Sequence, residues 1–288
     1  MPPSRLARVL AAGKEVGETL ANMTSSIWRA PSPLAVMGQD SITYKELAAG
    51  LAAFAAESGG DLQRHVVAPA MLDMVGPVSG KDMLDLYCGA GYLSRRLATM
   101  GANVTAVDSS DRLIGIAGEV DKREEHRIRY AVAEPTDLSV IEDSVFDDIV
   151  CNMGLMITRD LSGTIAELAR LVKLGGRFIF SVLHPCFSMP DACWTSSEDG
   201  KLLYRAVDNY FGEAWHLSEM SPGVRSDKAK IKHRTLSTYV NALSARGFNV
   251  RRLAEPKPTP EVVAVKPQLE VFARVPAVLI VEAIFPYF

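Results

Sequence analysis

DMLDLYCGAGYLSRRLA, residues 82–98, decides the fold of this chain. Its first five residues are mostly apolar, as in a short buried strand, and Gly89 and Gly91 permit a tight turn after it. Residues 92–98 have the pattern of an amphipathic helix. A glycine loop between a strand and a helix leaves main-chain N–H groups accessible, and the helix N-terminus adds a partial positive field. The stretch therefore predicts a site for a nucleotide-like ligand.

A second strand is predicted over residues 102–107, and it is followed by Asp108. An acid at the tip of the second strand is placed to accept both hydroxyls of a ribose, so we expect an adenosine derivative. Two ligands have this character, a nicotinamide dinucleotide and S-adenosylmethionine. A dinucleotide site favours a third glycine three residues after Gly91, where this sequence has Ser94.

Further helices and strands are predicted in alternation after this unit. Helices are expected over residues 64–75, 111–125 and 161–172 and from Thr235 or Ser237 to Gly247; strands are expected over residues 127–132, 148–152 and 177–183, after Gly247, and over residues 275–283. The pair Gly175-Gly176 is expected to end a helix, and residues 255–267 form a proline-rich loop. Alternating strands and helices imply an α/β doubly wound sheet, with its ligand crevice at the carboxyl ends of the strands.

Four motifs occur in a fixed order along the chain. They are DLYCGAG at residues 85–91, VDSS at 107–110, VFDDIVCN at 145–152 and LVKLGGRF at 171–178. Together they resemble class I S-adenosylmethionine-dependent methyltransferases. The resemblance implies a Rossmann-like, seven-stranded, mostly parallel sheet whose last strand is antiparallel. It also implies S-adenosylmethionine as cofactor and S-adenosylhomocysteine as product.

The resemblance assigns cofactor contacts to residues at the ends of the first four strands. These residues are Asp85, Tyr87, Cys88, Gly89, Gly91, Asp108, Ser109, Leu113, Ala133, Glu134, Asn152 and Met153. Two positions depart from the family pattern. Tyr87 stands where the family usually has glycine. Ala133 and Glu134 stand where the family often has an acid or amide that meets the adenine amino group.

Three alternative functions remain open. LDLYCG at residues 84–89 also resembles the RNA uracil-5 methyltransferases, although residues 151–154 read CNMG and lack the Asp-Pro-Pro segment of those enzymes. The second alternative is a methyltransferase fold recruited for a non-methylating cyclisation or for binding alone. The third is a nicotinamide-dependent oxidoreductase.

Composition agrees with a soluble enzyme. The chain has 288 residues, 48% of them apolar, and 31 basic against 34 acidic side chains give a net charge of −3. That balance argues against nucleic-acid binding, and no apolar run reaches the length of a membrane span. Four cysteines, at positions 88, 151, 186 and 193, lack C-x-x-C spacing. We interpret them as reduced thiols of a cytoplasmic protein with no metal site.

The domain organisation predicted from the sequence has two parts. Residues 1–60 form a helical extension, in which Thr43 and Glu46 make a capping box. It serves as a lid over the substrate or as a homodimer contact, or it only packs an apolar face on the main domain. Residues 61–288 form the S-adenosylmethionine-binding domain, with a cap inserted at about residues 184–234.

The cap is rich in aromatic residues, namely Phe187, Trp194, Tyr204, Tyr210, Phe211 and Trp215. Such an insertion at the ligand edge is suited to enclosing a small aromatic or apolar metabolite that accepts the methyl group on O, N or electron-rich C. His184 is the first candidate for a general base, with hydrogen bonding to the cap as its alternative role. His233 and His216 follow, and Tyr239 and Tyr210 are candidates for orienting the substrate.

Two segments of the cap region carry a narrower resemblance. SVLHPCF at residues 181–187 and HRTLSTYVNAL at residues 233–243 resemble a bacterial group of small class I methyltransferases, many of them natural-product tailoring enzymes. Secondary metabolism is therefore the expected setting, and a small molecule is the expected partner.

Overall fold

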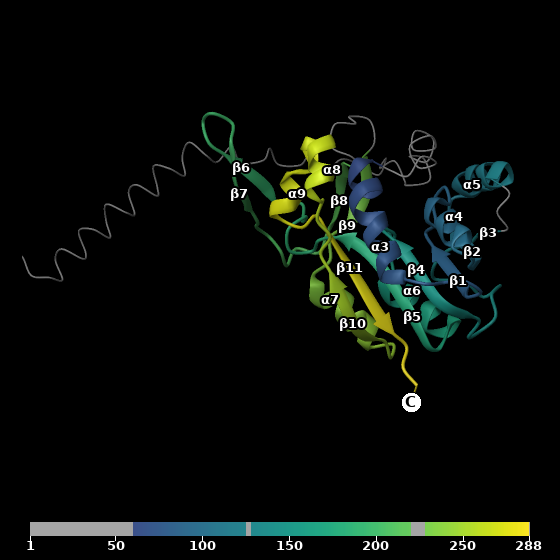
Figure 1. Cartoon of the computed structure of the whole chain (residues 1–288). Helices are drawn as coiled ribbons and strands as arrows, with labels where there is room; N and C mark the ends of the chain where they lie inside the picture. Colours follow the sequence, from purple (N-terminus) through teal and green to yellow (C-terminus); the bar gives the residue numbers. More distant parts are fainter. Residues whose placement is uncertain (1–59, 125–127, 220–227, 288) are drawn as a thin grey trace, which may run out of the picture. The chain divides into compact units, whose positions relative to one another are not determined.

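The computed structural model describes residues 60–124, 128–219 and 228–287 (Figure 1). The helical extension, with its capping box and its role as lid or dimer contact, lies outside the described residues except for Gly60.

A seven-stranded sheet forms the centre of the fold. Its strands are β1 (Asp82–Leu86), β2 (Asn103–Asp108), β3 (Arg129–Val132), β4 (Phe146–Asn152), β5 (Val172–Leu183), β10 (Asn249–Ala254) and β11 (Val278–Ile284). They lie in the order β10-β11-β5-β4-β1-β2-β3. The five strands from β5 to β3 run parallel, and β11 runs antiparallel to both of its neighbours, as Figure 1 shows in yellow. The predicted doubly wound, mostly parallel sheet is confirmed.

Helices cover both faces of this sheet. They are η1 (Gln63–Val67), α3 (Ala68–Val75), α4 (Tyr92–Thr99), α5 (Asp111–Glu124), α6 (Leu161–Leu171), α7 (Leu236–Ser244), α8 (Pro260–Val265), η2 (Pro267–Leu269) and α9 (Val271–Arg274). Side chains alternate along a strand, so Met83 packs with α3 and α4, whereas Leu84 and Leu86 pack in the core that contains α6 and α7. Burial on two sides explains why the apolar residues of β1 do not alternate strictly with polar ones.

Two local predictions were wrong. Gly175-Gly176 does not end α6, because that helix stops at Leu171 and β5 begins at once. The glycines lie inside the strand instead, where Gly175 has φ +77° and the pairing of β4 with β5 shifts register. This is a β-bulge, a feature that also uses glycine. The proline-rich segment contains α8, because Pro260 suits a first helical turn and Thr259 caps it.

The segment between β5 and α7 forms two hairpins. β6 (Cys193–Ser196) pairs with β7 (Leu202–Ala206), and β8 (Trp215–Glu219) pairs with β9 (Lys228–Lys232). The second hairpin returns the chain to the sheet, because the Lys232 N–H donates to the carbonyl of Met156 at 2.8 Å. α7 then begins with Thr235 as its N-cap, one of the two caps that the sequence allowed.

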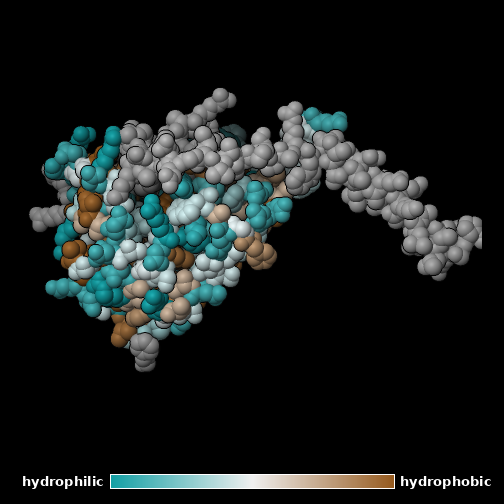
Figure 2. All heavy atoms as spheres, turned by 180° about the vertical axis from the view of Figure 1, so that it is seen from behind, coloured by the Kyte–Doolittle hydropathy of each residue, from teal (hydrophilic) through white to brown (hydrophobic). Residues whose placement is uncertain are grey.

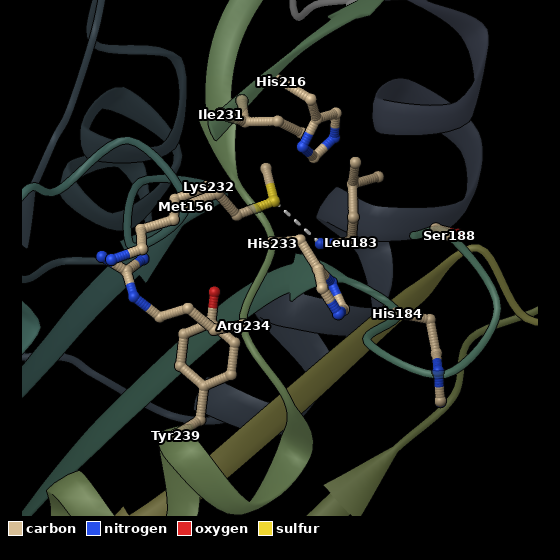
Figure 3. Close-up of a pocket in the computed structure, with 10 residues that line it drawn as sticks. All are labelled: Met156, Leu183, His184, Ser188, His216, Ile231, Lys232, His233, Arg234 and Tyr239. Atoms are coloured by element: carbon tan, nitrogen blue, oxygen red, sulfur yellow. Dashed lines mark hydrogen bonds between the residues drawn. The ribbon is translucent and has the colours of Figure 1, made fainter. Parts of the chain in front are cut away.

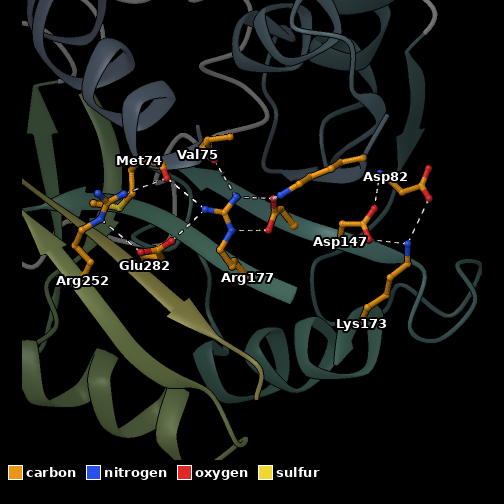
Figure 4. Close-up of polar contacts among 10 residues, drawn as sticks. Met74, Val75, Asp82, Asp147, Lys173, Arg177, Arg252 and Glu282 are labelled. Carbon is orange, nitrogen blue, oxygen red and sulfur yellow. Dashed lines mark hydrogen bonds and ion pairs between the residues drawn. The ribbon is translucent and has the colours of Figure 1, made fainter. Parts of the chain in front are cut away.

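A buried ion network holds the parallel strands together at the end where they begin (Figure 4). The guanidinium of Arg177 in β5 binds both carboxylate oxygens of Asp148 in β4, at 2.8 and 2.7 Å, and that of Glu282 in β11 at 3.1 Å. It also donates to the carbonyl of Val75 at the end of α3, and Lys81 binds Asp148 from the other side. Arg177 therefore fixes α3 against three strands.

The surface has no continuous apolar band on the face drawn in Figure 2, where hydrophobic residues stand singly among hydrophilic ones. Among the helices of the described residues, none combines the length and apolar character that crossing a membrane requires.

Candidate cofactor and substrate site

The loop between β1 and α4 leaves open space on one side. Gly89 and Gly91 both have positive φ, +57° and +78°. A Cβ placed on Gly89 meets no atom within 4 Å, whereas one placed on Gly91 lies 2.6 Å from the Tyr130 hydroxyl. Gly91 is therefore required by packing beneath the loop, and Gly89 keeps its outer side free for a ligand. An adenosine cofactor fits this arrangement.

Asp108 at the end of β2 is tied to this loop. Its carboxylate accepts the N–H of Gly89 at 2.9 Å and that of Ser110 at 2.9 Å, and burial raises its pKa. The two hydrogen bonds go to different oxygens of the carboxylate, so each oxygen keeps a lone pair that can accept from a ribose hydroxyl. Asp108 thus has the position that the sequence predicted, and it also holds the glycine loop in place.

The other predicted adenosine contacts surround the same strand ends. The Ala133 N–H donates to the carbonyl of Asp108 at 3.1 Å. Leu113 is buried and packs with Ala90 of the glycine loop. Glu134 is exposed, but its charge contributes to the raised pKa of Asp108. The cofactor assignments of these residues stay predictions.

Asp85 lies behind the loop with no access to solvent. It accepts a hydrogen bond from the Ser94 hydroxyl at 2.5 Å, which the motif resemblance did not indicate. Burial raises the pKa of Asp85 to about 7, and the neighbouring charge of Asp108 acts in the same direction. Asp85 therefore holds its proton over much of the acidic range in the folded protein.

Replacing Asp85 by asparagine is expected to change how stability depends on pH. The folded carboxyl keeps its proton up to about pH 7, while in the unfolded chain it loses the proton near 3.8, the ordinary pKa of an aspartate. The folded state thus binds more protons between these values, so a rise in pH destabilises the wild type, by at most about 1.4 kcal/mol per pH unit from this group. The free energy of unfolding of Asp85→Asn, measured by urea denaturation between pH 3.8 and about pH 7, should therefore fall less steeply with pH than that of the wild type. Parallel profiles for the two proteins would mean that Asp85 is ionised in the fold.

Tyr87 connects the glycine loop with the loop after β4. It has φ +57°, which is uncommon for a non-glycine residue, and a Cβ on Gly154 would lie 2.5 Å from the Tyr87 Cβ. In the loop after β4, Met153 donates its N–H to the Ser181 hydroxyl at 2.9 Å, and that hydroxyl donates to Asn152 at 2.7 Å. The departure from glycine at position 87 is therefore matched by a glycine at position 154.

A pocket lies at the carboxyl ends of β4 and β5 (Figure 3). It is narrow and opens to solvent, and it is lined by Met156, Leu183, His184, Ser188, His216, Ile231, Lys232, His233, Arg234 and Tyr239. The loop that contains Asn152 and Met153 continues to Met156 in the pocket wall. The pocket and the predicted cofactor residues therefore share one loop.

The contacts of His184 occupy both of its ring nitrogens. Nδ1 accepts the N–H of Cys186 at 3.2 Å, so the proton is on Nε2, which donates to Glu255 at 2.8 Å. This geometry matches the alternative role that the sequence left open, hydrogen bonding that orders the cap. Glu255 was not identified from the sequence, because it is 71 residues away.

Only one ring nitrogen of His233, Nε2, has a hydrogen-bond partner among the described residues, so the other can accept a proton. Its Nε2 lies 2.8 Å from the carbonyl oxygen of Tyr210, which can only accept, so Nε2 carries the proton. In the neutral ring Nδ1 then keeps its lone pair, and His233 lines the pocket. His233 is better placed than His184 to accept a proton from a substrate.

Tyr239 is the third predicted catalytic residue. It is buried, and its ring lies 6.1 Å from that of Phe180. Burial raises the pKa of Tyr239 to about 12, so its hydroxyl keeps its proton at neutral pH and can donate a hydrogen bond. A positioning role fits this environment.

The aromatic residues of the cap do not line this pocket. Phe187 packs on the His184 ring at 4.7 Å, Trp194 and Trp215 lie under Arg274 and Lys230, and the Tyr210 hydroxyl accepts the Leu236 N–H at 2.9 Å. Tyr204 and Phe211 are exposed. The aromatic residues stabilise the cap itself, because two-stranded hairpins outside the sheet need side-chain contacts of their own.

Two cations in the pocket were not recognised from the sequence. Arg234 stands inside the HRTLSTYVNAL segment, in which the sequence indicated only His233 and Tyr239 as site candidates, and Lys232 precedes that segment. No cluster of three or more metal-binding side chains occurs among the described residues.

Comparison with known proteins defines the class of this domain. Residues 84–180 match the family described as "Methyltransferase domain". A solved S-adenosylmethionine-dependent methyltransferase from Mesorhizobium loti has a TM-score of 0.64 at 25% identity over 78% of this chain and 98% of its own. One from Listeria monocytogenes, described as putative, has a TM-score of 0.62 at 28% identity over 75% of this chain and 94% of its own. The chain carries a class I S-adenosylmethionine-dependent methyltransferase domain, which confirms the predicted class and cofactor.

The matches to curated relatives extend over a smaller part of both proteins. The ubiquinone biosynthesis O-methyltransferase of Aromatoleum aromaticum is 31% identical over 126 residues, which are 43% of this chain and 54% of the relative. That of Xylella fastidiosa is 33% identical over 123 residues, 42% of this chain and 50% of the relative. The chain thus spans about half the length of the curated relatives it matches.

Proposed function

We propose that this protein transfers the methyl group of S-adenosylmethionine to an oxygen atom of a small molecule. The observation that carries the proposal is the available Nδ1 of His233, in a pocket that shares a wall with the predicted cofactor residues. An oxygen acceptor is favoured because a hydroxyl must lose its proton during methylation, and His233 is placed to take it. The O-methyltransferase names of the curated relatives agree with this choice.

In this proposal the residues of the chain divide the work. Asp108 and the loop around Gly89 hold the cofactor, which supplies an electrophilic methyl group. Tyr239 orients the acceptor, and His233 Nδ1 would take the hydroxyl proton as the acceptor oxygen receives the methyl group that the cofactor would supply, with S-adenosylhomocysteine as the other product. The pocket also holds the acceptor in line with the methyl group, so less translational freedom has to be lost during the reaction. Such alignment lowers the activation free energy by up to about 7–11 kcal/mol in the best intramolecular cases.

Other parts of the proposal come from the sequence. Residues 1–60 serve as a lid or a homodimer contact, and residues 61–288 form the catalytic domain with its cap. The setting is natural-product tailoring in the cytoplasm, with no role for nucleic acid or membrane.

Calorimetric titration with S-adenosylhomocysteine tests the cofactor site. Asp108→Ala removes two charge-assisted contacts that shape the glycine loop, so the affinity is expected to fall at least about 100-fold. Asp137→Ala is the matched control, because this exposed acid bonds only within its own turn, to Ser139. Nicotinamide dinucleotide should bind to none of the three proteins.

Labelled S-adenosylmethionine with a panel of hydroxylated small molecules tests the reaction. Label transfer to oxygen supports the proposal. Binding without transfer to any acceptor would favour a recruited, non-methylating fold, and transfer to RNA alone would favour the nucleic-acid alternative. Equal affinity of wild type and Asp108→Ala would refute the role of Asp108.

A further inference from the structure

The charged side chains that line the pocket at the ends of β4 and β5 are all positive. Among its ten lining residues are Lys232 and Arg234, and none is an acid. No carboxylate side chain that the structure describes lies within the 4.0 Å ion-pair distance of either cation. A cavity lined by one sign of charge attracts ligands of the opposite sign, and the effect grows where protein excludes water.

Arg234 contributes a buried charge that forms no direct ion pair with a described carboxylate. It is 3% exposed, and its guanidinium donates to the carbonyl oxygens of Leu155 at 2.9 Å and Thr158 at 2.6 Å. These neutral acceptors satisfy its hydrogen bonds but do not cancel its charge, and buried cations are usually paired. The carboxylate of Glu213 accepts hydrogen bonds from the hydroxyls of Thr235 and Thr238. Against the effect of burial, these bonds and the charge of Arg234 hold the pKa of Glu213 below its ordinary value, so Glu213 compensates Arg234 only from beyond ion-pair distance.

The polar groups of the pocket are separated in space. Figure 3 shows the imidazoles of His184, His216 and His233 on one side and the side chains of Lys232 and Arg234 extending to the other. On the imidazole side, Nδ1 of His216 is buried with no hydrogen-bond partner among the described residues. One side thus suits an anion, and the other suits a group that exchanges hydrogen bonds or a proton.

We propose that the pocket takes a hydroxy acid, whose carboxylate lies on the side of Lys232 and Arg234 while its hydroxyl faces His233. The inference rests on the proposed methyl transfer to oxygen and narrows its substrate to the acidic class. It replaces the apolar substrate that the aromatic cap suggested, since the aromatic side chains of the cap do not line this pocket. The carboxylate supplies the direct ionic partner that Arg234 lacks among the described residues.

Two probes of nearly equal shape test this inference, 4-hydroxybenzoate and 4-hydroxybenzamide. They are titrated calorimetrically into the full-length protein, with and without saturating S-adenosylhomocysteine. The acid is expected to bind at least about tenfold more tightly than the amide at low ionic strength, and the preference should shrink as salt is added.

Substitutions then locate the preference. Lys232→Gln and Arg234→Gln should each weaken binding of the acid several-fold and leave the amide unchanged, and glutamine at position 234 keeps amide donors for the two loop carbonyls. Lys201→Gln, the same change of charge at an exposed lysine in the β6–β7 turn, should have no effect. If Arg234→Gln fails to fold, Lys232→Gln carries the test.

The outcomes separate this inference from the proposed function. Equal binding of acid and amide by the wild type overturns the inference, and so does a preference that survives both pocket substitutions. A clear preference for the acid in a protein that neither binds S-adenosylhomocysteine nor transfers methyl groups would support the pocket and refute the methyltransferase activity.

Discussion

His233→Gln is expected to slow methyl transfer to a hydroxyl acceptor by about 100- to 10,000-fold, the usual contribution of a general base. The glutamine amide can replace the Nε2–H that donates to the Tyr210 carbonyl, but it offers no basic nitrogen at the position of Nδ1. The structure of the cap is therefore preserved while the proton acceptor is lost. The affinity for S-adenosylhomocysteine should stay within about twofold, because no predicted cofactor contact changes.

His184→Gln is the matched control for this experiment. Glutamine retains a donor for Glu255, and the ring nitrogen that it loses bonds only the Cys186 N–H. A rate within several-fold of wild type is expected. The reverse pattern, with a large loss for His184→Gln and little for His233→Gln, would return the role of base to His184. Single-turnover measurement with labelled cofactor separates the chemical step from product release.

Arg177→Met is expected to lower the free energy of unfolding by about 3–5 kcal/mol. The substitution removes the shared partner of Asp148 and Glu282, whose side chains are only 2% and 6% exposed. Two buried carboxylates are then left with reduced compensation, and the carbonyl of Val75 at the end of α3 loses its donor. Urea denaturation followed by circular dichroism measures the change.

Lys173→Met provides the comparison for Arg177→Met. Lys173 also forms ion pairs with two carboxylates, those of Asp147 and Asp82, but all three side chains are 34–43% exposed. Exposed pairs contribute about 0–1 kcal/mol because water and salt screen them. The prediction depends on this contrast, so equal losses for the two variants would show that burial of the Arg177 network is not the cause of its effect.

The sequence alone identified the parts of this protein that depend on neighbouring residues. The strand, glycine loop and helix of residues 82–98 and Asp108 at the end of β2 were predicted from the residues themselves, whereas the antiparallel position of β11 was implied by the family resemblance. The reason is physical: alternation of apolar residues, positive φ at glycine and the fixed path of a parallel crossover constrain the chain over short distances. Glycine also shows the limit of this reasoning, since the pair at positions 175–176 serves equally well in a bulge.

Only the tertiary structure decided the chemistry of the pocket. Its residues come from the ends of β4 and β5, from β8 and β9 and from α7, up to 83 positions apart, and no pattern in the sequence specifies which side chains meet. The proton positions on His184 and His233 follow from hydrogen-bond partners that folding brings to them. For His184 these are the Cys186 N–H, which donates to Nδ1, and the Glu255 carboxylate, which accepts from Nε2; for His233 the partner is the backbone carbonyl of Tyr210. Arg234 likewise becomes a buried cation without a direct ion pair among the described residues only because folding encloses it. Periodicity and motif spacing predict which edge of the sheet binds the ligand. The charge of the pocket at that edge, and the basicity of its histidines, depend on contacts between residues far apart in the sequence.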